Sequence, residues 1–127
     1  MKELNDYQEM LLFEYLMYKE IGNSRSNDDK YNEVKEYENN HEIVREVVLK
    51  YKDQYPPLLI IYAENDIKEN PEIFNWGLYS PAVARIKPHL LDTLHEHYNW
   101  KLYAWAVEKY CPEYMKYHPK NKQHEKQ

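Results

Sequence analysis

The sequence predicts an all-α protein, a single compact domain of roughly five to seven helices, and three observations carry this prediction. Only two of the 127 residues are Gly, whereas Leu, Glu, Lys and Tyr are abundant. No Asn-Gly or Asp-Gly pair marks a tight hairpin turn. All seven Pro lie from Pro56 onward, so we expect long helices first and short, Pro-punctuated helices in the second half.

The first helix is expected to run from Asn5 or Asp6 to Ile21. Asp6 is a good capping residue and Glu9 follows it by three positions, which is the spacing of a capping box. Gly22 stands where a left-handed residue would end the helix.

A polar loop over residues 22–29 and a second helical region over residues 30–55 are expected next. Residues 38–40 are weak helix formers, so this region should break or kink there. Its apolar side chains recur at turn spacing: Tyr31, Val34, Tyr37, Val44, Val47, Val48 and Tyr51.

The second half is divided by Pro and Asn into short helices. The run of residues 58–63 has the composition of a buried strand, but no second strand-like run exists, so a helix opened by Pro57 is preferred. Start signals then recur at Asn70-Pro71, Ser80-Pro81, Pro88, Asn99 and Pro112. The helix after Ser80-Pro81 should be kinked or restarted at Pro88, and Asn99 should cap the last strong helix.

We expect one helical domain over residues 1–118 and a disordered polar tail over residues 119–127. The single Cys111 excludes a disulfide within the chain and any multi-cysteine zinc site. No apolar run is long enough to span a membrane, and the start of the chain does not resemble a signal peptide. These features predict a cytoplasmic location.

The charges are distributed unevenly along the chain. Residues 1–72 carry a net charge of −8 and residues 73–127 carry +3, which gives the overall −5. If the second region were one helix, Glu38, Glu42 and Glu46 would form a single stripe, preceded by Glu33 and Glu36. Such a row is either a solvated face or a strip that docks on a basic protein.

Aromatic side chains supply the second candidate surface. The chain contains 14 Tyr and only two Phe. Tyr31 and Tyr37 lie beside the acidic row in sequence, and Trp105 projects away from the apolar stripe of the last strong helix. Because Trp and Tyr dominate interface hot spots, we assign these three residues to partner binding alongside the acidic row.

Several functional classes lack their signatures. The two Gly, 55 positions apart, exclude both Gly-rich nucleotide-binding loops, so no cofactor is expected. Three Arg and a pI near 5.7 argue against nucleic acid. Cys111 lies on an apolar stripe before Pro112, as expected for a buried structural thiol rather than a nucleophile.

The segment His89 to His97 is the densest group of titratable side chains. On one continuous helix, His89, Asp92 and Glu96 would share a face, with His95 one turn from Asp92. This spacing is no established zinc motif. A metal-dependent hydrolase built on these four residues is therefore the alternative interpretation.

We therefore predict a non-enzymatic, cytoplasmic protein-binding domain without metal or cofactor, whose acidic, Tyr-rich face docks on a basic protein. Its small size, acidity and single Cys are typical of inhibitors, antitoxins and immunity proteins. The wealth of Lys, Asn, Tyr, Ile and Glu is typical of a low-GC bacterium or its phage. A homo-oligomeric structural or assembly protein is a further alternative.

Overall fold

A computed structural model describes residues 4–120. These residues form helices and turns only, which confirms the all-α prediction. Their contacts divide the chain into two units, Met1–Ala63 and Glu64–Gln127. The expectation of one domain over residues 1–118 remains a prediction. Within the described part, none of the helices has the length and apolar character needed to cross a membrane.

Unit 1 begins with α1 (Asp6–Ile21), the longest helix described. The predicted cap was wrong by one residue: the Asn5 side chain accepts from the Gln8 backbone, and the Gln8 side chain accepts from the Asn5 backbone. Gly22 ends the helix in the left-handed conformation, with φ of 74°, as the sequence predicted.

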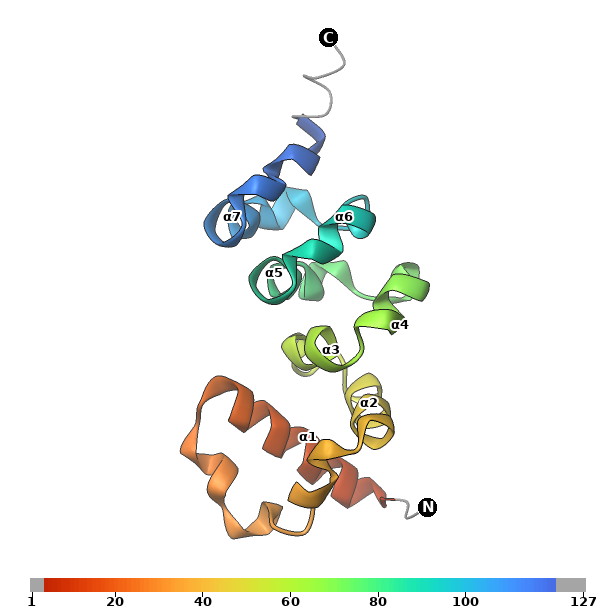
Figure 1. Ribbon diagram of the computed structural model, residues 1–127, viewed down its shortest axis with the longest axis vertical. Coiled ribbons are helices and arrows are strands. Elements are labelled where there is room, and N and C mark those ends of the chain that lie inside the picture. Colours follow the sequence, from red (N-terminus) through yellow and green to blue (C-terminus); the bar gives the residue numbers. More distant parts are fainter. Residues whose placement is uncertain (1–3, 121–127) are drawn as a thin grey trace. The chain divides into compact units, whose positions relative to one another are not determined.

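The chain then turns back through three short 3₁₀ segments, η1 (Ser24–Asn27), η2 (Asp29–Tyr31) and η3 (Lys35–Asn39), and returns to α1 (Figure 1). The first part of the predicted helical region over residues 30–55 is therefore 3₁₀ rather than α-helical. Backbone bonds of the i→i+3 type run from Val34 to Tyr31 and from Tyr37 to Val34, at 3.0 Å each. These buried side chains are three apart because a 3₁₀ helix has three residues per turn.

Two regular helices complete unit 1. The predicted break before residue 41 is confirmed, because the Asn40 side chain caps the Ile43 N–H of α2 (His41–Lys50). α3 (Pro56–Tyr62) has Pro in its first turn, so the helical interpretation of residues 58–63 is also confirmed. The core between these helices and α1 contains Leu11, Leu12, Leu16, Val44, Val47, Val48, Leu58 and Leu59.

Unit 2 opens with α4 (Glu64–Glu69), η4 (Pro71–Ile73) and α5 (Trp76–Ile86). The prediction that Ser80-Pro81 begins a helix was wrong. α5 instead begins five residues earlier, where the Asn75 side chain accepts from the Gly77 N–H at 3.0 Å. Gly77 therefore lies inside α5.

Pro81 lies inside α5 because other groups satisfy the backbone that it disturbs. Its ring has no N–H to give the Gly77 carbonyl, four residues earlier. The Tyr103 hydroxyl donates to that carbonyl at 2.9 Å. The buried Ser80 hydroxyl donates to the Trp76 carbonyl at 2.7 Å and accepts from the Asn99 N–H at 2.9 Å.

The rest of unit 2 follows the predicted punctuation. Pro88 ends α5 and starts η5 (Pro88–Leu90), which continues into α6 (Leu91–Leu94). The Asn99 side chain caps α7 (Trp100–Tyr110), and Pro112 starts η6 (Pro112–Tyr117). Cys111 is buried, and burial raises the pKa of its thiol to about 11. Most of the predicted tail, residues 121–127, lies outside the described residues.

Candidate interaction surfaces

The acidic residues of unit 1 do not form the single helical stripe that the sequence predicted. Glu36 and Glu38 belong to η3, and Glu42 and Glu46 belong to α2, on the other side of the break at Asn40. The stripe failed because it presumed one α-helical register across residues 38–46. The row therefore divides into carboxylates that hold unit 1 together and carboxylates that remain exposed.

Glu38 belongs to the first kind. One of its oxygens forms an ion pair with Lys19, and the other accepts from the Tyr15 hydroxyl at 3.1 Å. Hydrogen bonding to Glu38 raises the pKa of the Lys19 amine above its usual value. Glu33 also faces α1, because its carboxylate accepts from the Gln8 amide at 3.5 Å. Glu38 in particular fastens η3 to α1.

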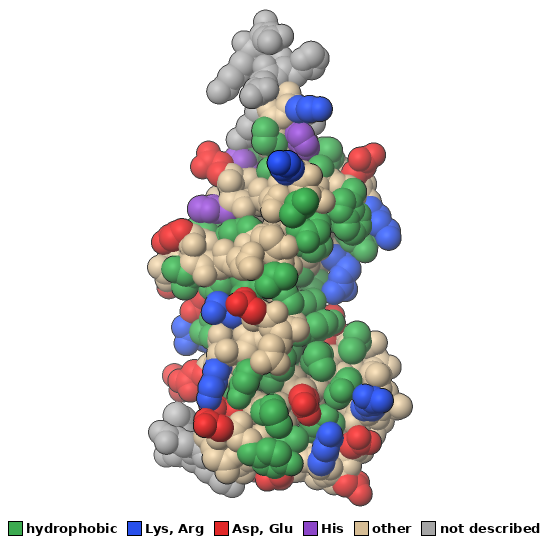
Figure 2. All heavy atoms as spheres, turned by 180° about the vertical axis from the view of Figure 1, so that it is seen from behind, with side chains coloured by type: hydrophobic (Ala, Val, Ile, Leu, Met, Phe, Trp, Pro, Cys, Tyr) green, Lys and Arg blue, Asp and Glu red, His purple; other side chains and the backbone are tan. Residues whose placement is uncertain are grey.

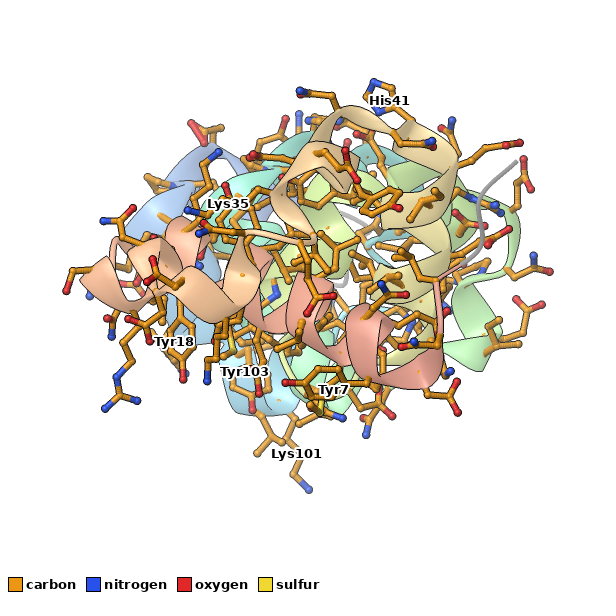
Figure 3. The ribbon with its side chains drawn as sticks, turned by 90° about the horizontal axis from the view of Figure 1, so that it is seen from below. Tyr7, Tyr18, Lys35, His41, Lys101 and Tyr103 are labelled. Atoms are coloured by element: carbon orange, nitrogen blue, oxygen red, sulfur yellow. The ribbon has the colours of Figure 1, made fainter. Side chains whose placement is uncertain are left out.

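Glu36, Glu42 and Glu46 belong to the second kind, and we refer to these three exposed carboxylates of unit 1 together as the acidic surface. All three are exposed, and none forms an ion pair with another described residue. Unit 1 carries 13 acidic and 8 basic side chains, a net charge of −5, whereas unit 2 carries nine of each. The negative charge of the protein therefore resides in unit 1. Figure 3 shows His41, the residue before Glu42, on the side of unit 1 away from Tyr7 and Tyr18.

Tyr31 and Tyr37, assigned to partner binding from the sequence, are buried in unit 1. The Tyr31 hydroxyl donates to Glu14 at 3.0 Å, and burial raises the pKa of Tyr31 well above its usual value. A ring buried in the core cannot form contacts with a partner without unfolding its surroundings. Neither residue therefore belongs to an exposed binding surface.

Trp105 is different, because its side chain is 53% exposed. It lies on α7 with Leu102, which is 57% exposed, and with Lys101, Glu108 and Lys109, which are also exposed. We call this group the Trp105 surface. In Figure 3 the Lys101 side chain extends away from the helix. Large exposed apolar side chains rimmed by charges are characteristic of interaction sites.

Three of the four residues of the alternative metal site contact other side chains or backbone, and the fourth is exposed. His89 lies 3.0 Å from Glu64, Asp92 accepts from the Tyr117 hydroxyl at 2.7 Å, and Glu96 is exposed. The His95 ring bonds the Leu91 carbonyl and stacks on Tyr117 with 4.3 Å between centroids. The helix ends at Leu94, so the predicted common face does not exist.

No group of three or more His, Cys, Asp or Glu side chains in the described part of the chain is placed to hold a metal ion. Figure 2 shows the histidine side chains of one face, in purple, as separate patches rather than one cluster. The proximity of His89, Asp92, His95 and Glu96 in sequence therefore does not become a ligand set in space.

Glu64 is a charged centre that the sequence analysis missed. One of its oxygens lies 2.7 Å from the Lys87 amine, and the other lies 3.0 Å from His89 and 3.1 Å from Lys68. These three partners lower the pKa of the Glu64 carboxyl to about 2. Only Lys68 stands at a helical spacing, so Lys87 and His89 gave no local signal. The group joins α4 to the segment before α6.

Comparisons with known proteins add no further information. No protein-family model, curated protein or solved structure matches this chain. The two exposed surfaces, one in each unit, are therefore the candidate functional sites.

Proposed function

We propose that this chain is a non-enzymatic binding protein of the inhibitor, antitoxin or immunity type, and that its acidic surface docks on a basic protein. The observation that carries the proposal is the exposure of Glu36, Glu42 and Glu46 without ion-pair partners among the described residues. Other carboxylates of unit 1 are used internally, as Glu38, Glu9 and Asp6 are with Lys19 and Lys50.

Electrostatics gives the acidic surface its proposed role. Exposed carboxylates without ion-pair partners can pair with the cationic side chains of a partner at low desolvation cost. The net charge of −5 on unit 1 also attracts a basic surface from a distance. Glu42 and Glu46 stand one turn apart on α2, where like charges destabilise a helix slightly. Binding a cationic partner would relieve that repulsion.

The absence of a catalytic role is part of the same proposal. Cys111 is buried with a raised pKa, which is unfavourable for a thiolate nucleophile. The buried Ser80 hydroxyl is occupied by two backbone partners. These are the placements of structural side chains.

The test reverses the charges of the acidic surface. A protein captured from the native host by the wild-type chain is purified, and its Kd is measured for wild type and for the triple variant Glu36→Lys, Glu42→Lys and Glu46→Lys. We expect the variant to bind at least about tenfold more weakly, since like-charge contacts would replace attractive ones.

The matched control carries the same charge change elsewhere. Glu69, Glu72 and Glu113 are exposed carboxylates of unit 2, and their triple change to Lys should leave the Kd close to that of wild type. Equal weakening of binding by both triple variants would show that the effect comes from the net charge and not from the position of the acidic surface. An unchanged Kd in the acidic-surface variant would contradict the proposal.

A further inference from the structure

The Trp105 surface exposes an indole that the rest of unit 2 does not use. The Trp76 and Trp100 indoles donate to the carbonyls of Pro71 and His95, at 2.8 and 2.9 Å. The Trp105 indole N–H has no such acceptor in the described part of the chain. With more than half of its side chain exposed, Trp105 contributes little to the core of unit 2.

The backbone beneath this surface is held in an unusual but fixed conformation. Tyr103 has φ of −127° and ψ of 23°, which kinks α7 between Leu102 and Trp105. Its hydroxyl donates to Gly77 at 2.9 Å, and its carbonyl accepts from the Tyr98 hydroxyl at 2.8 Å. Its ring lies 6.4 Å from that of Trp105. The anchor residues therefore lie on fixed backbone, which lowers the entropic cost of binding.

Two cations give the Trp105 surface its chemistry. Lys101 precedes Trp105 by four residues and Lys109 follows it by four, and both are exposed. Neither pairs with a carboxylate among the described residues. Glu108 is the one acidic side chain of the group. A complementary surface must therefore present carboxylates around an apolar contact.

We propose that the Trp105 surface binds the acidic surface of a second copy of this chain. That surface presents Glu36, Glu42 and Glu46 to the two Lys. Leu49, half-buried on α2, follows Glu46 by three residues and Glu42 by seven, so it lies on the same helical face and offers Trp105 an apolar contact.

The exposed apolar side chains of α1 are a poorer candidate for self-association. On α1, Tyr7 and Ile21 are more than half exposed, but they belong to unit 1, which carries −5. Two copies of α1 would therefore bring like charges together, which disfavours association through that helix. The Trp105 surface and the acidic surface have opposite charges, so their contact is favourable. This inference rests on the proposed function in one respect only, which is that both proposals use the same acidic surface.

The first experiment measures the mass of the full chain by analytical ultracentrifugation from micromolar concentration up to about 0.5 mM. We expect mass above the monomer at low salt, and association weakened about tenfold or more when salt rises from about 50 to about 500 mM. A chain that stays monomeric over this range overturns the inference and leaves the proposed function unaffected.

The decisive experiment exchanges the charges between the two surfaces. The variant Lys101→Glu, Lys109→Glu and the variant Glu42→Lys, Glu46→Lys should each lose self-association, and an equimolar mixture of the two should regain it. Trp105→Ala should weaken association about tenfold or more. A control variant, Arg85→Glu with Lys120→Glu, changes the same charge at exposed positions of unit 2 and should associate like wild type.

Two results of these measurements contradict the proposal. Association that persists unchanged in the Lys101, Lys109 variant or in Trp105→Ala would place the contact elsewhere. If the chain is monomeric and binds an oligo(dT) strand that Trp105→Ala no longer binds, the surface serves nucleic acid instead. The Lys101, Lys109 variant retains the acidic surface, so its binding of a basic protein tests the proposed function separately. Circular dichroism of each variant checks the fold.

Discussion

Four Tyr hydroxyls of this protein donate to carboxylates, a contact that Phe could not form. Tyr15 donates to Glu38, Tyr31 to Glu14, Tyr55 to Glu20 and Tyr117 to Asp92, at 2.5–3.1 Å. Phe would fill the same space but would remove one hydrogen-bond donor from each of these carboxylates. Four of the 14 Tyr are therefore used to bind carboxylates within the fold.

Tyr31 gives the sharpest test of these pairs, since its ring is fully buried. We expect Tyr31→Phe to lower the free energy of unfolding by about 1–2 kcal/mol, because Glu14 loses a hydrogen bond while the packing is kept. Urea denaturation measures this difference. Tyr7→Phe, at an exposed ring, is the control and should change it by less than about 0.5 kcal/mol. Equal effects of the two variants would show that the pair contributes nothing.

Glu64 predicts a pH dependence of stability. Its folded-state pKa of about 2 lies below the ordinary value of 4.5, so its stabilising contribution is complete above about pH 4.5 and is lost as the pH falls towards 2. We expect Glu64→Gln to cost about 1–2 kcal/mol at pH 7 and almost nothing near pH 2. The free energy of unfolding, measured from pH 2 to 7 for both proteins, should show curves that converge at the acidic end. Parallel curves would contradict this assignment.

At the scale of the element, local signals predicted most helix ends and failed where a distant residue decides. Gly22, Asn40 and Asn99 act within four residues of their own position, so the sequence reveals them. Ser80-Pro81 has the local pattern of a helix start. The helix nevertheless continues through Pro81, because the Tyr103 hydroxyl satisfies the Gly77 carbonyl, and Tyr103 lies 22 residues further along the chain. No local pattern contains that contact.

The candidate surfaces show the same limit. The exposure of Trp105 followed from the apolar stripe of its own helix, whereas the burial of Tyr31 and Tyr37 depends on how η2 and η3 pack on α1. The strict three-residue spacing of Tyr31, Val34 and Tyr37 was the available signal for a 3₁₀ segment. The prediction of a single α-helical register over these residues therefore placed Glu38 on the wrong element.

Gly22 is the helix end whose contribution can be measured most cleanly. Its φ of 74° is unfavourable for any residue with a Cβ, and an added Cβ would meet no atom within 4 Å. We therefore expect Gly22→Ala to destabilise the protein by about 1–2 kcal/mol through backbone strain alone. Asn tolerates this conformation better, so Gly22→Asn should cost clearly less in the same urea titrations. Equal costs for Ala and Asn would contradict the conformational argument.

At the scale of the whole molecule, the asymmetry of charge predicts how a basic partner approaches. Unit 1 holds the entire net charge of −5, while unit 2 is neutral overall, so the field around the protein guides cations towards unit 1. Changing Glu36, Glu42 and Glu46 to Gln reduces the net charge to −2 without adding any repulsive group. We expect this variant to bind more weakly, mainly because its association rate constant is lower.

The size of the change in kon and its dependence on salt distinguish long-range electrostatic steering from short-range contacts. At low ionic strength kon for the basic partner should fall about tenfold in the Gln variant, and wild-type kon should decline towards the variant's value as salt is added. Surface plasmon resonance can follow the association and dissociation rates of both proteins. The same three changes placed at Glu69, Glu72 and Glu113 should leave kon close to that of wild type. If the variant instead altered koff at constant kon, the carboxylates would act through short-range contacts, and the field of unit 1 would have no part in recognition.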